Sequence, residues 1–149
     1  MNSSDLPIFQ ARWRDLKALR AHESICFNQD DAWPLIELFG VLIQPKIVRL
    51  KIEVDSQIVG FFAGLPLRNS EYGTVLTISV LPGWQGQGLG KRLLATGETA
   101  LDRPIIELTT RRSNAAAINL YKGAGYVQTG VREGYYFGED GLIFEKHIR

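Results

Sequence analysis

Three glycines at alternate positions, Gly86, Gly88 and Gly90, are followed at once by the cations Lys91 and Arg92. The apolar run before them predicts a strand, and the leucines after them have helical spacing. The first turn of a helix carries backbone N–H groups without partners in the helix, at the positive end of its dipole. Glycines let an anion approach those groups closely. The stretch therefore predicts a phosphate or pyrophosphate site.

Glycine spacing alone does not identify the ligand. The chain lacks the string Gly, four residues, Gly-Lys-Ser/Thr that nucleoside triphosphatases use. The dinucleotide fingerprint G-x-G-x-x-G also fails from Gly86 and from Gly88, although Glu107 follows at the distance of a ribose-binding acid. A dinucleotide-binding module stays an alternative. A plain turn is disfavoured, because each glycine costs up to ~1 kcal/mol at a helix start.

Two segments carry a family resemblance. Gln85-Gly86-Gln87-Gly88-Leu89-Gly90 resembles the pyrophosphate loop Arg/Gln-x-x-Gly-x-Gly/Ala of the GCN5-related N-acetyltransferases (GNAT). The stretch from Asn114 to Tyr121, closed by Gly125-Tyr126, resembles that family's Asn-x-x-Ala-x-x-Leu-Tyr-x-x-x-Gly-Phe helix. The resemblance covers residues 46–149 well and the first third loosely.

The elements that must position these motifs can be read from periodicity and turn residues. Asp15 is expected to cap the first helix, and Glu133-Gly134 is expected to be a loop. Strands are predicted over 6–11, 47–54, 57–67, 74–80, 104–111, 126–132 and 142–148, and helices over 15–27, 32–42, 89–102 and 114–123. This order predicts an α/β protein with helices on both sides of a mixed sheet. A chain of 149 residues is expected to form a single domain, residues 1–149. The resemblance implies a largely antiparallel seven-stranded sheet that splays between strands 4 and 5.

The resemblance implies acetyl-CoA as the donor and CoA as the product. Backbone groups of Ile78 and Val80 would pair with the pantetheine arm as an added strand. Ser113 or Asn114 is expected to cap the helix that follows, and by resemblance Asn114 also contacts the carrier. The residues expected at the pyrophosphate are Gln85, Gly86, Gln87, Gly88, Leu89, Gly90 and Lys91.

Acetyl transfer to an amine also needs a base for the amine and an acid for the departing thiolate. Tyr121 is the candidate acid, with core packing as its alternative role, and by resemblance it also contacts the carrier. Relatives often place the base where this chain has Thr74 and Thr109, which cannot titrate. Glu107 lies two residues before Thr109 on the same strand face and could act through water. Pairing of Glu107 with Arg111 or a lysine is an equal alternative, and Glu71, in the loop before the fourth strand, is a weaker candidate, so the base stays open.

The acceptor is expected to be a primary amine. The segment 132–136 resembles the Tyr-Tyr segment of the ribosomal-protein N-terminal alanine acetyltransferases, where it lines the slot for a protein N-terminus. Tyr135 and Tyr136 would line that slot here, with Trp33 as the opposite wall. Phe137 stands where that group has proline, so small-molecule amines also stay possible acceptors.

Composition argues against several other classes of protein. The 149 residues carry a net charge of +1, which argues against a nucleic-acid binder. There is no long apolar run and no secretory signal, so neither a membrane span nor export is expected, and a cytoplasmic setting fits. No metal site is expected either. His22 and Cys26, four residues apart, are interpreted as a buried thiol beside a histidine.

A lone cysteine makes a covalent acetyl-enzyme improbable, so we expect direct attack by the amine in a ternary complex. Loss of the usual base would instead favour a non-catalytic acyl-CoA-binding or regulatory module, which is the alternative function. A homodimer is compatible with the sequence. The sequence identifies neither the acceptor, the oligomeric state nor the biological role.

Overall fold

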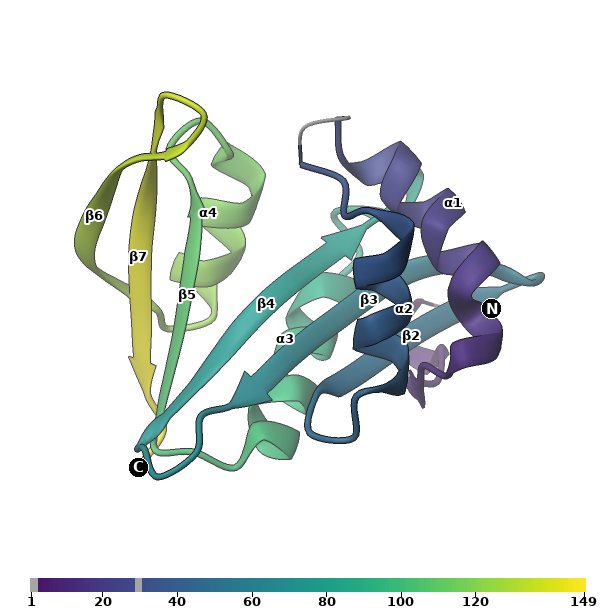
Figure 1. The fold of residues 1–149 in the computed structure, drawn as a ribbon, viewed down its shortest axis with the longest axis horizontal. Helices are drawn as coiled ribbons and strands as arrows, with labels where there is room; N and C mark the ends of the chain where they lie inside the picture. Colours follow the sequence, from purple (N-terminus) through teal and green to yellow (C-terminus); the bar gives the residue numbers. More distant parts are fainter. Residues whose placement is uncertain (1–2, 29–30) are drawn as a thin grey trace. The chain divides into compact units, whose positions relative to one another are not determined.

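The computed structural model describes residues 3–28 and 31–149 (Figure 1). The chain forms two compact units, one from residues 1–65 and 76–101 and the other from residues 66–75 and 102–149. No helix in the described ranges is long and apolar enough to cross a lipid bilayer.

Seven strands form a sheet in the order β1-β2-β3-β4-β5-β7-β6. β4 and β5 pair in parallel, whereas β1–β2, β2–β3, β5–β7 and β6–β7 are antiparallel. The strands are β1 (Phe9–Gln10), β2 (Val48–Val54), β3 (Gln57–Pro66), β4 (Tyr72–Val80), β5 (Ile105–Arg111), β6 (Val127–Tyr136) and β7 (Glu139–His147). The predicted class, α/β with a mixed and largely antiparallel seven-stranded sheet, is confirmed.

In the first unit, helices lie on both faces of the strands (Figure 1). α1 (Leu16–Cys26) and α2 (Leu35–Ile43) lie on one face. They share with β3 a buried apolar cluster whose members are Ala11, Leu19, Leu38, Val41, Leu42, Ile58, Phe61 and Ala63. α3 (Leu89–Leu101) packs on the other face, where a Cβ on Gly97 would overlap the Phe62 ring. The glycine therefore lets α3 approach β3 closely.

β3 contains a bulge. The successive β2 residues 52–53 are opposite Gly60 and Ile58, so Val59 is an extra residue in this register. The Val59 carbonyl accepts a hydrogen bond of 2.9 Å from the N–H of Leu81, the residue that follows β4. The bulge is thus tied to the end of the strand that leads into the glycine stretch.

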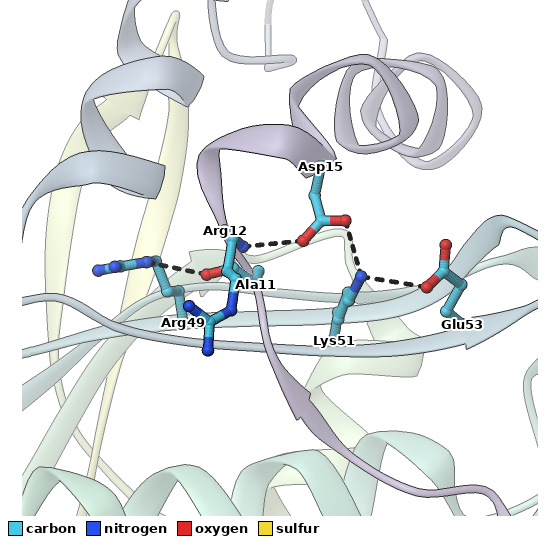
Figure 2. Close-up of polar contacts among 6 residues, drawn as sticks. All are labelled: Ala11, Arg12, Asp15, Arg49, Lys51 and Glu53. Carbon is cyan, nitrogen blue, oxygen red and sulfur yellow. Dashed lines mark hydrogen bonds and ion pairs between the residues drawn. The ribbon is translucent and has the colours of Figure 1, made fainter.

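Asp15 stands at the N-cap position of α1, but its side chain does not cap the helix. Its carboxylate accepts a hydrogen bond of 2.8 Å from the N–H of Arg12 and one of 2.7 Å from Nζ of Lys51 (Figure 2). Arg49 donates from Nε to the carbonyl of Ala11 at 3.0 Å in the same region (Figure 2). Asp15 is the N-cap residue of α1, as predicted, but its side chain makes no cap hydrogen bond there, because its carboxylate binds Lys51 and the N–H of Arg12.

The second helix begins later than predicted. Residues 32–34 precede it, and Pro34 occupies the cap with an extended ψ of 152°. The N–H of Leu38 donates to the Pro34 carbonyl at 3.1 Å, which starts the helical ladder. The fixed φ of proline suits a helix boundary, so α2 runs from Leu35 to Ile43.

In the second unit, α4 (Ala115–Gly123) follows β5. The Asn114 side chain accepts a hydrogen bond of 3.1 Å from the N–H of Ala117, which confirms its predicted capping role.

β6 runs through Glu133-Gly134, so the predicted loop there is wrong. The register with β7 is irregular between Arg132 and Tyr136, and Gly134 has a φ of +62°. Glu133 and Gly134 therefore belong to β6, at a point where its pairing with β7 is irregular. The chain turns at Phe137-Gly138, where both residues have positive φ.

Candidate active site

The glycine stretch forms the loop between a short 3-10 helix, Pro82–Trp84, and α3. Gly86 and Gly88 have φ of +77° and +85°, and no atom lies within 4 Å of where a Cβ would stand on either. The first hydrogen bond of the helical ladder joins the N–H of Arg92 to the Gly88 carbonyl at 3.1 Å. The N–H groups of residues 89–91 therefore have no acceptor within the helix. Their position and the open space beside the glycines suit a phosphate.

Side chains beside this loop bind the N-terminal segment. The Gln87 side chain accepts a hydrogen bond from the Ser3 hydroxyl. Arg92 donates to two backbone carbonyls within residues 3–6, at 3.0 and 2.7 Å. Arg92 thus serves to hold this segment against α3, whereas Lys91 is exposed at the start of the helix.

Backbone groups of Ile78 and Val80 point away from β3. The N–H of Leu81 points toward β3, because it donates to a carbonyl there. Backbone groups of successive strand residues alternate between the two edges, so those of Ser79 also face β3 and those of Ile78 and Val80 face the opposite edge. On that edge the Val80 carbonyl accepts a hydrogen bond of 3.0 Å from the Gln85 side chain. The edge predicted to pair with pantetheine therefore ends beside the glycine loop.

α1 places a histidine and a cysteine against the neighbouring strands. The His22 ring lies with Nδ1 2.8 Å from the Ile58 carbonyl, and with Nε2 2.7 Å from Oγ of Ser79 and 3.5 Å from Sγ of Cys26. Burial lowers the pKa of His22. Burial, helped by the nearby Glu23, raises the pKa of Cys26 to about 11. A neutral imidazole beside a protonated thiol agrees with the predicted interpretation, and such a thiol is a poor nucleophile.

Tyr121, on α4, is 6% exposed. Its ring centroid lies 6.0 Å from that of Tyr126 and 6.1 Å from that of Phe144, so the ring packs in the core of the second unit. Burial raises the pKa of Tyr121 well above its ordinary value, with a smaller contribution from Tyr136. The phenol therefore keeps its proton at neutral pH, which is the state that an acid requires.

Glu107 and Thr109 share one face of β5, as predicted, because Arg132 contacts both. Nη2 of Arg132 lies 3.2 Å from Oε1 of Glu107, and its Nε donates to Oγ1 of Thr109 at 3.3 Å. In the parallel register Glu107 is the direct neighbour of Thr74 on β4. A carboxylate therefore lies next to both threonines. Its ion-pair partner is Arg132 and not the predicted Arg111.

The two predicted acceptor tyrosines have different surroundings. Tyr135 is 58% exposed and meets the Tyr136 ring edge-on, with 4.9 Å between centroids. The Tyr136 hydroxyl donates to the Thr109 carbonyl at 3.0 Å, and the Arg111 guanidinium lies 4.7 Å above its ring. Tyr136 is thus held in place, whereas Tyr135 offers an exposed aromatic surface. Trp33 belongs to the first unit, where it packs half-buried against the α1–α2 cluster.

The hairpin that carries these tyrosines is also held by charge. Nη1 of Arg111 lies 3.0 Å from Oε2 of Glu139, and Oε1 of the same carboxylate accepts from the N–H of Ser113 at 2.9 Å. Hydrogen bonds from Ser113 and the charge of Arg111 lower the pKa of Glu139. The start of β7 is thereby fixed to the end of β5.

Each unit brings together part of the predicted site. The first unit gathers the carrier residues Ile78, Val80, Gln85, Gly86, Gln87, Gly88, Leu89, Gly90 and Lys91 along one continuous stretch. Leu89 is 1% exposed, so only its backbone can meet a ligand. Sequence reasoning missed the pairing of His22 with Ser79 and that of Glu107 with Arg132. The first pair is 57 residues apart and the second 25, and neither spacing carries a local signal.

Comparison with known proteins identifies the family. The model of the acetyltransferase (GNAT) family matches residues 9–126. N-alpha-acetyltransferase RimI of Mycobacterium tuberculosis is 32% identical over 117 residues, which cover 76% of this chain and 73% of that protein. The ribosomal-protein-S18-alanine N-acetyltransferase of Escherichia coli has a similar crystal structure, with a TM-score of 0.83, 26% identity, and coverage of 95% and 93%.

A structure with bound donor is also similar. A Bacillus anthracis protein assigned as a streptothricin acetyltransferase, solved with acetyl coenzyme A, has a TM-score of 0.65 and 25% identity over 74% of this chain and 67% of that one. The family match spans most of the chain and includes both motifs. The chain therefore belongs to the acetyltransferase (GNAT) family, and it is an N-acetyltransferase.

Proposed function

We propose that this protein transfers an acetyl group from acetyl-CoA to a primary amine by direct attack within a ternary complex. The acceptor is a protein N-terminal α-amine or the amine of a small molecule. The observation that carries the proposal is the glycine loop at the start of α3. Gly86 and Gly88 leave open space there, and the N–H groups of residues 89–91 have no helical acceptor.

Acetyl-CoA fits the residues of this stretch. Its pyrophosphate is bound by the backbone N–H groups of the loop, with Lys91 adding positive charge. Its pantetheine amides pair with the outward edge of β4 at Ile78 and Val80. The Gln85 amide donates a hydrogen bond of 3.0 Å to the Val80 carbonyl. Because this carbonyl already has a donor, the pairing with pantetheine ends there. Asn114 contacts the carrier while it caps α4.

The acceptor ammonium first gives one proton, through water, to Glu107, and its neutral nitrogen attacks the thioester carbonyl carbon. The nitrogen loses its second proton to water as the C–N bond forms and the C–S bond breaks. The thiolate of CoA takes the phenolic proton of Tyr121, and water then reprotonates the phenolate. Burial keeps the Tyr121 phenol protonated at neutral pH, but the same shift in its pKa makes the phenol a weaker proton donor, so the support for this role is its place in the family's helix motif. The position of Glu107, beside Thr74 in the sheet register, supports its role as base.

A protein N-terminus is the acceptor class that we favour. The family relatives include N-alpha-acetyltransferase RimI, and the E. coli structure is that of a ribosomal-protein-alanine N-acetyltransferase. Tyr135, at 58% exposed, offers an aromatic surface to the acceptor beside the anchored Tyr136. Trp33, in the connection between α1 and α2, is proposed as a further aromatic side chain of the acceptor site. An α-amino group has a pKa near 8, so a base acting through water is adequate.

The test is thermal melting with acetyl-CoA, CoA and NAD, followed by thiol release with peptides that begin in different residues and with small amines. Ligand at 100 times its dissociation constant adds about 2.7 kcal/mol, a rise in Tm of about 5–10 °C for this size. Stabilisation by acetyl-CoA with thiol release on a peptide would support the transferase and its acceptor class.

Other outcomes favour other functions. Stabilisation by acetyl-CoA without release on any amine would favour the non-catalytic acyl-CoA-binding module, for which Thr74 and Thr109 are the supporting residues. Stabilisation by NAD but not by acetyl-CoA or CoA would favour a dinucleotide-binding module. No stabilisation by acetyl-CoA would contradict the role given to the glycine loop.

A further inference from the structure

His22 joins three elements of the first unit at one point. It projects from α1, and its ring hydrogen-bonds to the Ile58 carbonyl of β3 at 2.8 Å and to the Ser79 hydroxyl of β4 at 2.7 Å. His22 is 1% exposed and Ser79 is 8% exposed. Water therefore does not compete for either hydrogen bond.

The partners determine the proton positions on the ring. A carbonyl oxygen only accepts, so Nδ1 of His22 carries the proton and donates to Ile58. Nε2 is then an acceptor, and the hydroxyl of Ser79 donates to it. Burial lowers the pKa of His22, so the ring stays neutral and these roles stay fixed. The imidazole therefore holds the two strands in one arrangement.

The contacts of His22 lie where β4 is also anchored through its backbone. Ile58 and Val59 are adjacent on β3, at the bulge. The first carbonyl accepts from His22, and the second accepts from the N–H of Leu81 at 2.9 Å. Two neighbouring carbonyls of β3 thus fix the end of β4, one through the Ser79 side chain and one through the backbone.

We propose that His22 is a positioning residue for binding of the acyl carrier, acting through Ser79. Ser79 lies between Ile78 and Val80, whose backbone groups face the edge assigned to the pantetheine arm. Holding the middle residue from the α1 side sets the position of both flanking residues on the other edge. This inference rests on the proposed use of that edge by acetyl-CoA.

The same pair does not act as a nucleophile and its base. A histidine that accepts from a serine hydroxyl activates the serine when a substrate reaches it. Ser79 is buried beneath α1, and Nε2 of His22 is also contacted by the Cys26 thiol at 3.5 Å. The hydrogen bond is therefore used to position β4.

The test compares variants that remove one hydrogen bond with variants that retain it. Ser79→Ala leaves Nε2 of His22 without its hydroxyl donor, whereas Ser79→Thr keeps the hydroxyl. His22→Gln keeps an amide near the position of Nε2. Val41→Ala is the matched control, because Val41 is buried in the α1–α2 cluster and its loss lowers stability away from β4. Acetyl-CoA affinity is measured by calorimetry, and KM and kcat by thiol release, at least 15 °C below each Tm.

We expect Ser79→Ala to weaken acetyl-CoA binding about tenfold and to raise KM similarly, with kcat nearly unchanged, because β4 loses its side-chain hydrogen bond to His22 and the edge at Ile78 and Val80 is held less firmly. Ser79→Thr and His22→Gln should stay within about threefold of the parent protein. Val41→Ala should lower Tm without changing affinity. If Ser79 had only a structural role, Ser79→Ala would likewise lower Tm and leave the acetyl-CoA affinity unchanged.

The outcomes separate this inference from the proposed function. If the parent protein binds acetyl-CoA and Ser79→Ala binds it equally well, the positioning role is overturned and the function stands. Equal weakening in Val41→Ala and Ser79→Ala would also overturn it, because general destabilisation would then explain the effect. If the parent protein binds acetyl-CoA without turnover, the transferase fails while the positioning role is still decided by affinity. Absence of acetyl-CoA binding by the parent protein would overturn both.

Discussion

Glu23→Gln is expected to stabilise the protein, and more so as the pH rises. Glu23 lies on the inner face of α1 and is 2% exposed. Neither carboxylate oxygen has a hydrogen-bond partner of normal geometry among the residues that the structure describes. Burial raises the pKa of Glu23 from 4.5 to about 7, and the backbone N–H of Trp33 opposes this only in part. The folded state therefore favours the protonated acid.

The sign and size of the effect follow from this pKa. Between pH 4.5 and about 7 the folded state holds a proton on Glu23 that the unfolded state has lost, so stability falls as the pH rises through that range. The full penalty above pH 7 is about 3 kcal/mol. Glutamine has nearly the same shape and does not ionise. The advantage of Glu23→Gln should therefore grow by about 2 kcal/mol from pH 5 to pH 8, or by roughly 4–8 °C in Tm.

Urea unfolding of both proteins at half-unit steps from pH 5 to pH 8 measures this difference directly. Glu37→Gln is the control, since it makes the same change of side chain at an exposed residue of α2. Parallel stability curves for the parent protein and Glu23→Gln would refute the reasoning, because the carboxylate would then have to be compensated in the folded state. A lower stability of Glu23→Gln at pH 8 would refute it more strongly.

Three further predictions concern the site. Tyr121→Phe should lower kcat about a hundredfold while calorimetry shows nearly unchanged acetyl-CoA affinity, and lost binding would contradict the acid role. Gly88→Ala, at a φ of +85°, should weaken acetyl-CoA binding by at least tenfold, whereas Gly83→Ala, also in open space but without positive φ, should not. Glu107→Gln should reduce kcat at pH 7 and lose less activity at pH 9, where more of the amine is already neutral; equal losses at both pH values in a pH–rate profile would argue against a base.

Sequence reasoning succeeded where the deciding interactions are local. The glycine loop, the helix after it and the Asn114 cap each depend on residues within one or two turns of one another, so composition and spacing predicted them. The alternation in β2 and β3 likewise predicted their hairpin. In these places residues close together in the sequence determine the backbone conformation.

It failed where a distant residue competes with a local one. Asp15 has a residue type that caps helices, but Lys51 of β2 binds its carboxylate at 2.7 Å. Glu133-Gly134 has a loop composition, yet pairing with β7 continues on both sides of it. The ion pair of Glu107 with Arg132 depends on strand order in the sheet. None of these outcomes is encoded in spacing along the chain.

Cys26 gives the protein an internal reporter of local opening. It is the single thiol in the chain, and its pKa of about 11 in the folded state leaves only about one molecule in a thousand as thiolate at pH 8. Release of α1 from β4 would return the thiol to an ordinary pKa and raise its reactivity about a hundredfold. The rate of labelling by a chromogenic disulfide, compared with and without acetyl-CoA in the absence of an acceptor amine, would therefore report any release of this helix from β4. Because so little of Cys26 is thiolate, the protein itself adds almost no signal to an assay that measures released CoA by its thiol.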